Sequence, residues 1–198
     1  MHSICIILAC RHPFGLRHIR WAWGCQLVLQ GVPVSMFTAD FSASDLDPAL
    51  KPVLMLWQNA SEAGAFPRLA ELSLPYVSTT TNILAVFEIE RTGSGELSDF
   101  KALYVRSKII NTLSTKVAGT RLSERPGFGP GSMIWTCFAE VAANPRPLLV
   151  SLPYVGPLPE YRSSTEIMLP LRGEGASVDY VMTGVVLLEQ EYRRPDRA

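Results

Sequence analysis

The chain holds few of the side chains that nucleophilic or metal chemistry requires. All three histidines, at positions 2, 12 and 18, lie near the amino terminus, and from residue 26 onward Cys137 is the only cysteine. The body of the chain therefore has no ligand set for a zinc site of the Cys/His type, no base for a Ser-His-Asp triad and no disulfide framework. We expect a protein that is not an enzyme and has no metal site.

Two short motifs could still suggest catalysis or phosphate binding. Residues 98–101 satisfy the S-x-x-K pattern of penicillin-binding enzymes, whose chemistry needs the serine and the lysine on one face of a helix. Here the surrounding pattern predicts a strand, and no K-T-G motif follows. The glycine-rich residues 127–131 follow no strand, and Pro130 removes an amide that a phosphate would use. We interpret this segment as a turn. Glu124 and Glu166 are isolated carboxylates, for which we expect surface or sheet positions without an acid–base role.

The candidate ligand-binding residues are one arginine and four large apolar or aromatic side chains. They are Arg121, Met133, Trp135, Phe138 and Tyr154. Arg121 offers a cation for a carboxylate or phosphate, and the others could line an apolar pocket. The alternative is ordinary core packing, which the helical spacing favours for Met133 and Phe138. Trp135 lies off the apolar stripe and could face a partner or a helix end.

Composition excludes several classes of protein. The 198 residues include 18 basic and 18 acidic side chains, so the formal net charge is zero, and there is no run of Lys or Arg that would favour a nucleic-acid partner. With 47% apolar residues the chain is expected to fold. Arginines at positions 11, 17 and 20 interrupt the apolar segments near the amino terminus, so we expect no membrane span. These features favour a cytoplasmic protein.

The first 38 residues differ in composition from the remainder. They hold all the histidines, three of the four cysteines and no acidic residue. Three interpretations are open: a secretory signal built on residues 4–10, a genuine extension, or a start site assigned too early. No basic residue precedes the short apolar run, which argues against a signal. We favour the last interpretation, with synthesis beginning at Met36, because Met36 immediately precedes the point where the composition becomes ordinary.

Hydrophobic periodicity then predicts the elements that must position the candidate residues. Strands are predicted at residues 83–90, 100–106, 148–154, 165–171 and 180–189, and helices at 45–60 and 132–143, with weaker helical turns at 107–118. In the first helix Asp47 and Pro48 are typical of an amino terminus, but Pro52 indicates a kink or a later start near Lys51. Ser132 is a suitable cap for the second helix, in which Cys137 is expected to be an inert, buried thiol.

The order of these elements predicts an α+β fold. Residues 83–106 and 148–189 are expected to join in one five-stranded antiparallel sheet, with helices on one face and an N-terminal helical segment before it. A cavity between the helix at 132–143 and the sheet is the natural site for a ligand.

Several segments resemble the small PAS-like family found mostly in alphaproteobacteria. The residues that carry the resemblance are AGTRLSE at 118–124, NPRP at 144–147, YRSSTEIMLPLR at 161–172 with 175–182 after it, and the helix around Trp57. The resemblance implies an N-terminal helix and linker at 39–80, a PAS-like domain at 81–191 and a short tail at 192–198.

The resemblance also implies a function. A stand-alone PAS-like module would bind a small ligand or a protein partner and relay its state without catalysis, and it would be expected to form a homodimer. No cofactor is identified: residues 132–143 hold no histidine for haem, and Cys137 lacks the flanking pattern of light-sensing flavin domains. The alternatives are a purely structural interaction module without a ligand and, more weakly, a small enzyme.

Overall fold

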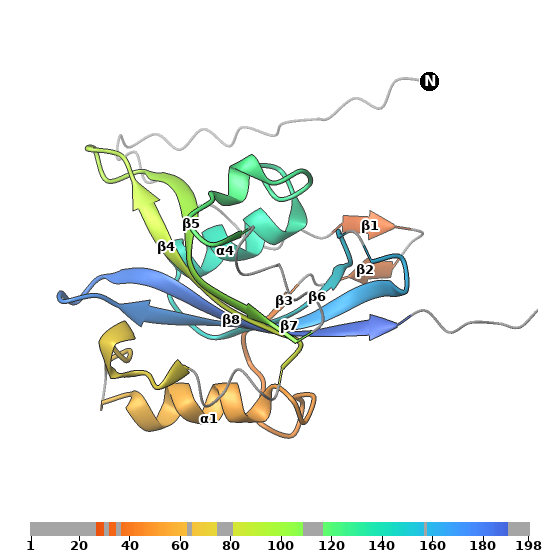
Figure 1. Cartoon of the computed structure of the whole chain (residues 1–198), viewed down its shortest axis with the longest axis horizontal. Helices are drawn as coiled ribbons and strands as arrows, with labels where there is room; N and C mark the ends of the chain where they lie inside the picture. Colours follow the sequence, from red (N-terminus) through yellow and green to blue (C-terminus); the bar gives the residue numbers. More distant parts are fainter. Residues whose placement is uncertain are drawn as a thin grey trace, which may run out of the picture. The chain divides into compact units, whose positions relative to one another are not determined.

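An antiparallel sheet organises the structure. The computed structural model describes residues 27–29, 32–34, 37–62, 65–74, 81–108, 117–156 and 158–189. The strands of the sheet are β3 (Phe37–Thr38), β4 (Ile83–Arg91), β5 (Leu97–Ser107), β6 (Leu148–Pro153), β7 (Tyr161–Arg172) and β8 (Val178–Glu189). They lie in the order β3-β6-β7-β8-β4-β5 (Figure 1).

Pairing across the sheet joins parts of the chain that are far apart in sequence. β4 and β5 form a hairpin, and the other side of β4 pairs with β8, where Leu84 lies opposite Gly184. β7 pairs with both β8 and β6. The predicted α+β class and the single antiparallel layer are therefore confirmed. The two-residue β3, which pairs with β6, lies inside the range assigned to the extension and was not predicted.

The helices begin where the sequence chemistry places them. Helix α1 (Lys51–Ala60) begins at Lys51, the later start that Pro52 indicated, and has this proline in its first turn. Before the helix, Asp47 accepts a hydrogen bond from the Ala49 amide. Helix α4 (Met133–Ala143) is capped by Ser132, whose Oγ accepts from the Trp135 amide at 3.2 Å. Two 3-10 helices, η1 (Leu69–Glu71) and η2 (Leu122–Glu124), complete the described helical elements.

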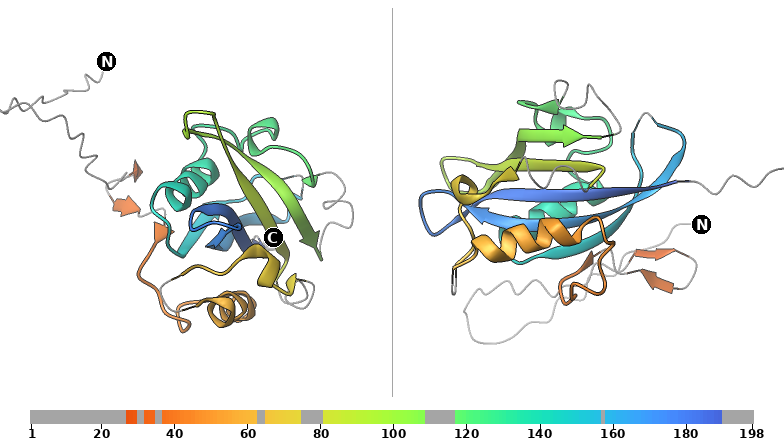
Figure 2. Two further views of the ribbon diagram at one scale, coloured as in Figure 1. Left: turned by 90° about the vertical axis from the view of Figure 1, so that its left-hand side faces the viewer. Right: turned by 60° about the horizontal axis from the view of Figure 1, so that its bottom comes forward.

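Helices cover both faces of the sheet, whereas the prediction placed helices on one face and assigned no face to the N-terminal helix. Figures 1 and 2 show α1 and α4 on opposite sides of the strands. We call these the α1 face and the cavity face. Along β7, Ile167, Leu169 and Leu171 contact the α1 side, whereas Met168 belongs to the core under α4. A nearly continuous apolar run is typical of a strand buried on both sides, which is the physical reason for the second cover.

On the α1 face the helix approaches the backbone of the sheet closely. A Cβ atom added at Gly184 would lie 3.1 Å from a Val53 methyl and 3.3 Å from an Ile167 methyl. The Trp57 indole N–H donates to the Pro170 carbonyl at 2.8 Å, which anchors the helix to β7. This side of the sheet is closed by direct contact between α1 and the strands.

The structure divides into two units after Val34. In the first unit the described residues form one antiparallel hairpin, β1 (Leu27–Leu29) with β2 (Val32–Val34). Predictions for residues 1–26, for Met36, for most of the turns at 107–118 and for the tail at 192–198 lie outside the described residues. Among the described helices, none is long and apolar enough to cross a membrane.

Candidate functional site

A cavity of about 220 Å³ lies on the cavity face of the sheet. All five long strands, β4 to β8, contribute residues to its lining. Val117, η2, α4 and the loops at 125–128 and 154–156 contribute the others. Most of the lining side chains are aliphatic or aromatic, and those from the sheet include Ala85, Phe87 and Val185. An apolar cavity with few polar groups is the usual form of a small-molecule site.

Three of the five predicted binding residues line this cavity. Met133 and Phe138 reach it from α4, and Tyr154 reaches it from the loop after β6. Phe138 also packs against Phe87, with ring centroids 4.9 Å apart, so the helix and the sheet meet at the edge of the cavity. Trp135 is not among the lining residues: its ring packs edge-on against Phe100 at 5.2 Å.

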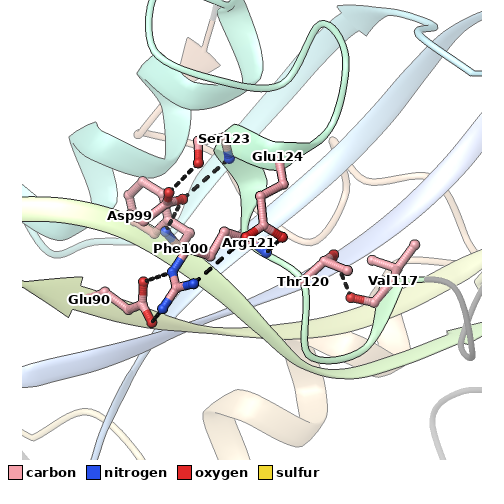
Figure 3. Close-up of polar contacts among 8 residues, drawn as sticks. All are labelled: Glu90, Asp99, Phe100, Val117, Thr120, Arg121, Ser123 and Glu124. Carbon is pink, nitrogen blue, oxygen red and sulfur yellow. Dashed lines mark hydrogen bonds and ion pairs between the residues drawn. The ribbon is translucent and has the colours of Figure 1, made fainter.

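Arg121 also lies outside the cavity, because acidic side chains hold it elsewhere. Its Nε and Nη2 donate to the two carboxylate oxygens of Glu90 at 2.6 and 3.0 Å, and Glu124 lies 3.7 Å from Nη1 (Figure 3). The bond to Glu90 raises the pKa of the arginine above its ordinary value. Arg121 was predicted to bind a ligand anion, but it forms a bidentate pair with a carboxylate of the protein itself.

Asp99 makes a second connection between the same segments. It is buried in β5, and its Oδ1 accepts from the amides of Phe100 at 2.7 Å and Ser123 at 3.3 Å. The Ser123 hydroxyl also donates to the Asp99 carboxylate (Figure 3). The S-x-x-K residues around Asp99 belong to β5, as predicted.

We call the Glu90–Arg121 and Asp99–Ser123 contacts the clasp. The clasp ties η2 to β4 and β5. Leu122, which lies between Arg121 and Ser123, is buried and lines the cavity. Because residues 125–128 follow η2 directly, the clasp also fixes where that loop starts. The AGTRLSE motif at 118–124 therefore positions part of the cavity lining.

The most unusual side chain in the cavity is Glu166 on β7, which was not predicted as a site residue. It is only 9% exposed, and its Oε1 accepts a hydrogen bond from the Ser164 hydroxyl at 2.7 Å. Burial raises the pKa of this carboxyl to about 7, although the Ser164 hydrogen bond and the charge of Arg125 oppose the shift. The expected sheet position is confirmed, since Glu166 lies in β7, but the side chain is buried beside the cavity and not exposed.

A cation does approach the cavity, but it is Arg125 and not Arg121. Its guanidinium lies 4.0 Å from the centroid of the Phe128 ring, and both residues line the cavity. Burial lowers the pKa of this arginine, and the nearby Glu166 carboxylate partly offsets that effect. Within the described part of the chain, no acidic oxygen lies within ion-pair distance of it.

The two loops that line the cavity touch each other. Gly127 has φ +80°, and a Cβ atom there would lie 2.9 Å from a Val155 methyl. The Phe128 amide donates to the Arg125 carbonyl at 3.0 Å, and the Ser132 amide donates to the Gly129 carbonyl at 3.0 Å, which confirms the turn predicted at 127–131. Glycine is required at position 127 both for the left-handed backbone and for the close approach of the second loop.

The remaining reactive side chain near the cavity is not a nucleophile. Cys137 is buried in α4, as predicted, and burial raises the pKa of its thiol to about 12. Among the residues that the structure describes, no group of three His, Cys, Asp or Glu side chains could hold a metal ion. The arrangement can bind a molecule and exchange a proton or hydrogen bond with it at Glu166.

Comparisons of the chain with protein-family models, with curated proteins and with solved structures found no match.

Proposed function

We propose that this protein is a PAS-like sensory module of the cytoplasm that binds a small molecule on the cavity face and relays its presence to a partner. The observation that carries the proposal is the cavity itself. At about 220 Å³ it is larger than the roughly 150 Å³ that suffices to hold benzene in an apolar protein interior.

Helix α4 is the element through which occupancy is relayed. Met133 and Phe138 on this helix line the cavity, and Phe138 packs against Phe87 and Phe100 of the sheet at centroid distances of 4.9 and 5.1 Å. A ligand that contacts these side chains favours one packing of α4 on the sheet over another. The signal then depends on the difference in affinity between the two packings.

The surface that meets a partner is the outer side of α1. Helix α1 covers the face of the sheet opposite the cavity. Met55 on α1 is 57% exposed, which is unusual for a large apolar side chain in this structure. We propose that α1 contributes to a homodimer or to the contact with another protein.

Native mass spectrometry of the purified full-length chain, with its absorbance spectrum, tests the proposal. A bound molecule that is lost when Ala85 is replaced by Phe, which fills the cavity, is the expected result. Replacement of the exposed Leu103 by Phe is the matched control and leaves the bound molecule in place. A protein that carries no molecule, and in which A85F and wild type bind small aromatic probes equally, supports the interaction module without a ligand.

A further inference from the structure

We infer that the cavity binds a flat aromatic molecule whose N–H group donates a hydrogen bond to Glu166, an inference that rests on the proposed function. Glu166 lines the cavity and is nine-tenths buried. Its Oε1 is already occupied by the Ser164 hydroxyl, whereas Oε2 accepts a hydrogen bond from no described residue. Because Glu166 is one of the residues that line the cavity, a ligand there that carries a donor can supply a hydrogen bond to its second oxygen.

The shape of the cavity favours a ring system. Aromatic side chains line it from separate elements: Phe87 from β4, Phe138 from α4, and Phe128 and Tyr154 from the two loops. Aromatic groups in such a site pack edge-to-face or offset against a bound ring. Aliphatic side chains such as Val185 complete the lining and add no donor or acceptor.

A ligand carboxylate fits this position poorly. It would place a second negative charge beside Glu166, and like charges at close range disfavour ionisation of both groups. The other charged or titratable groups facing Glu166 are Arg125, after η2, and Cys137, on α4. Arg125 lies over the Phe128 ring and Cys137 stays a neutral thiol, so a neutral N–H donor on the ligand suits this carboxylate.

Indole and indene distinguish the hydrogen bond from simple filling of the cavity. The two molecules have nearly the same shape, but only indole has an N–H donor. We expect wild-type protein at pH 8 to bind indole about tenfold more tightly than indene, because a hydrogen bond to a charged group contributes on that order. Ligand-observed NMR titration measures both affinities.

Variants of two glutamates complete the test. Glu166→Met keeps the size of the side chain and removes the acceptor, so we expect it to bind indole and indene equally. Glu96→Gln, in the exposed turn between β4 and β5, keeps the wild-type preference. If E166M fails to fold, the wild-type preference at pH 8 against pH 5 replaces it: protonation of Glu166 at the lower pH weakens binding of indole and leaves that of indene unchanged.

The outcomes separate the inference from the proposed function. Equal binding of indole and indene to the wild type overturns the hydrogen bond and leaves the cavity as a ligand site. Binding of neither probe, to a protein that carries no other molecule, overturns both. If the protein is purified with a molecule already bound, its mass identifies it, and a molecule without an N–H donor overturns the inference directly.

Discussion

The α1 face and the cavity face are built from the same strands and differ in how they are closed. On the α1 face, apolar side chains of α1 contact the sheet directly, and Gly184 allows Val53 to approach the backbone. On the cavity face, α4 and two loops leave a space of about 220 Å³ with a buried carboxyl group beside it. Close packing is the ordinary state of a protein interior, and voids larger than a water molecule are few.

This contrast separates stability from function within one sheet. Filling a cavity usually stabilises a protein, so a cavity that keeps polar groups lowers the stability of the folded state. A binding role would explain why it is present. Ser164, Glu166 and Thr183 all lie on the cavity face, whereas the α1 face of the same strands carries Ile167, Leu169 and Met182. We therefore expect substitutions on the two faces to have different consequences.

The largest effect is expected from opening a hole on the α1 face. Leu169 is fully buried there, and Leu169→Ala should lower the free energy of unfolding by about 2–5 kcal/mol. Urea unfolding followed by circular dichroism measures the loss. Leu103→Ala, on an exposed position of β5, should change stability by less than about 0.5 kcal/mol. A small loss for L169A would mean that α1 does not pack on the sheet as described.

The next effect concerns the buried carboxyl and depends on pH. Because the pKa of Glu166 rises from 4.5 to about 7 on folding, its stabilising effect is complete below pH 4.5 and is lost as pH rises to 7. Glu166→Gln removes this dependence and should be more stable than wild type at pH 8, by up to a few kcal/mol, with little difference at pH 4.5.

Thermal unfolding of both proteins from pH 4.5 to 8 checks the prediction. An arginine stays charged over this range, and the raised pKa of Cys137 keeps its thiol neutral, so neither contributes to the difference. Glu96→Gln, at an exposed position, should follow the wild-type curve. Parallel curves for wild type and E166Q would show that Glu166 is not buried in its neutral form.

Substitutions that enlarge a side chain compare the packing of the two faces directly. Gly184→Val forces methyl groups against Val53 and Ile167 and should cost about 1–3 kcal/mol. Ala85→Val adds the same kind of group beside the cavity and should cost less than about 1 kcal/mol or stabilise. Chemical denaturation measures both. Equal losses for the two variants would contradict the difference in packing between the faces.

The smallest effect is expected in the clasp. Asp99→Asn retains one acceptor oxygen for the donors from Phe100 and Ser123 and should lower stability by about 1 kcal/mol. Arg121→Met, at an arginine whose side chain is 47% exposed, should lower it by less. The melting temperatures of the two variants check this order, and a larger loss for R121M would show that the ion pair to Glu90 dominates the clasp.

The amino-acid pattern alone was sufficient for the elements of this fold. The period of two in β4 and the later strands, the proline at position 52 and the cap at Ser132 act within a few residues. The five long strands and the two α-helices therefore formed close to their predicted ranges, whereas β3 was not predicted. The order of the predicted strands and helices also indicated one antiparallel sheet. Met133, Phe138 and Tyr154 were identified as cavity candidates because large apolar side chains on a helix and a strand end face the core.

Contacts between segments that are distant in sequence determined which charged side chains reach the cavity and which are buried. Arg121 and Arg125 have the same side chain four positions apart, and only the position of Glu90, 31 residues away, assigns the first to an ion pair and leaves the second beside the cavity. Glu166 is buried because α4 and the two loops cover the cavity face of β7, and the pattern along the strand does not specify where those segments lie. Charge and burial at a site depend on neighbours in space, whereas sequence patterns report neighbours along the chain.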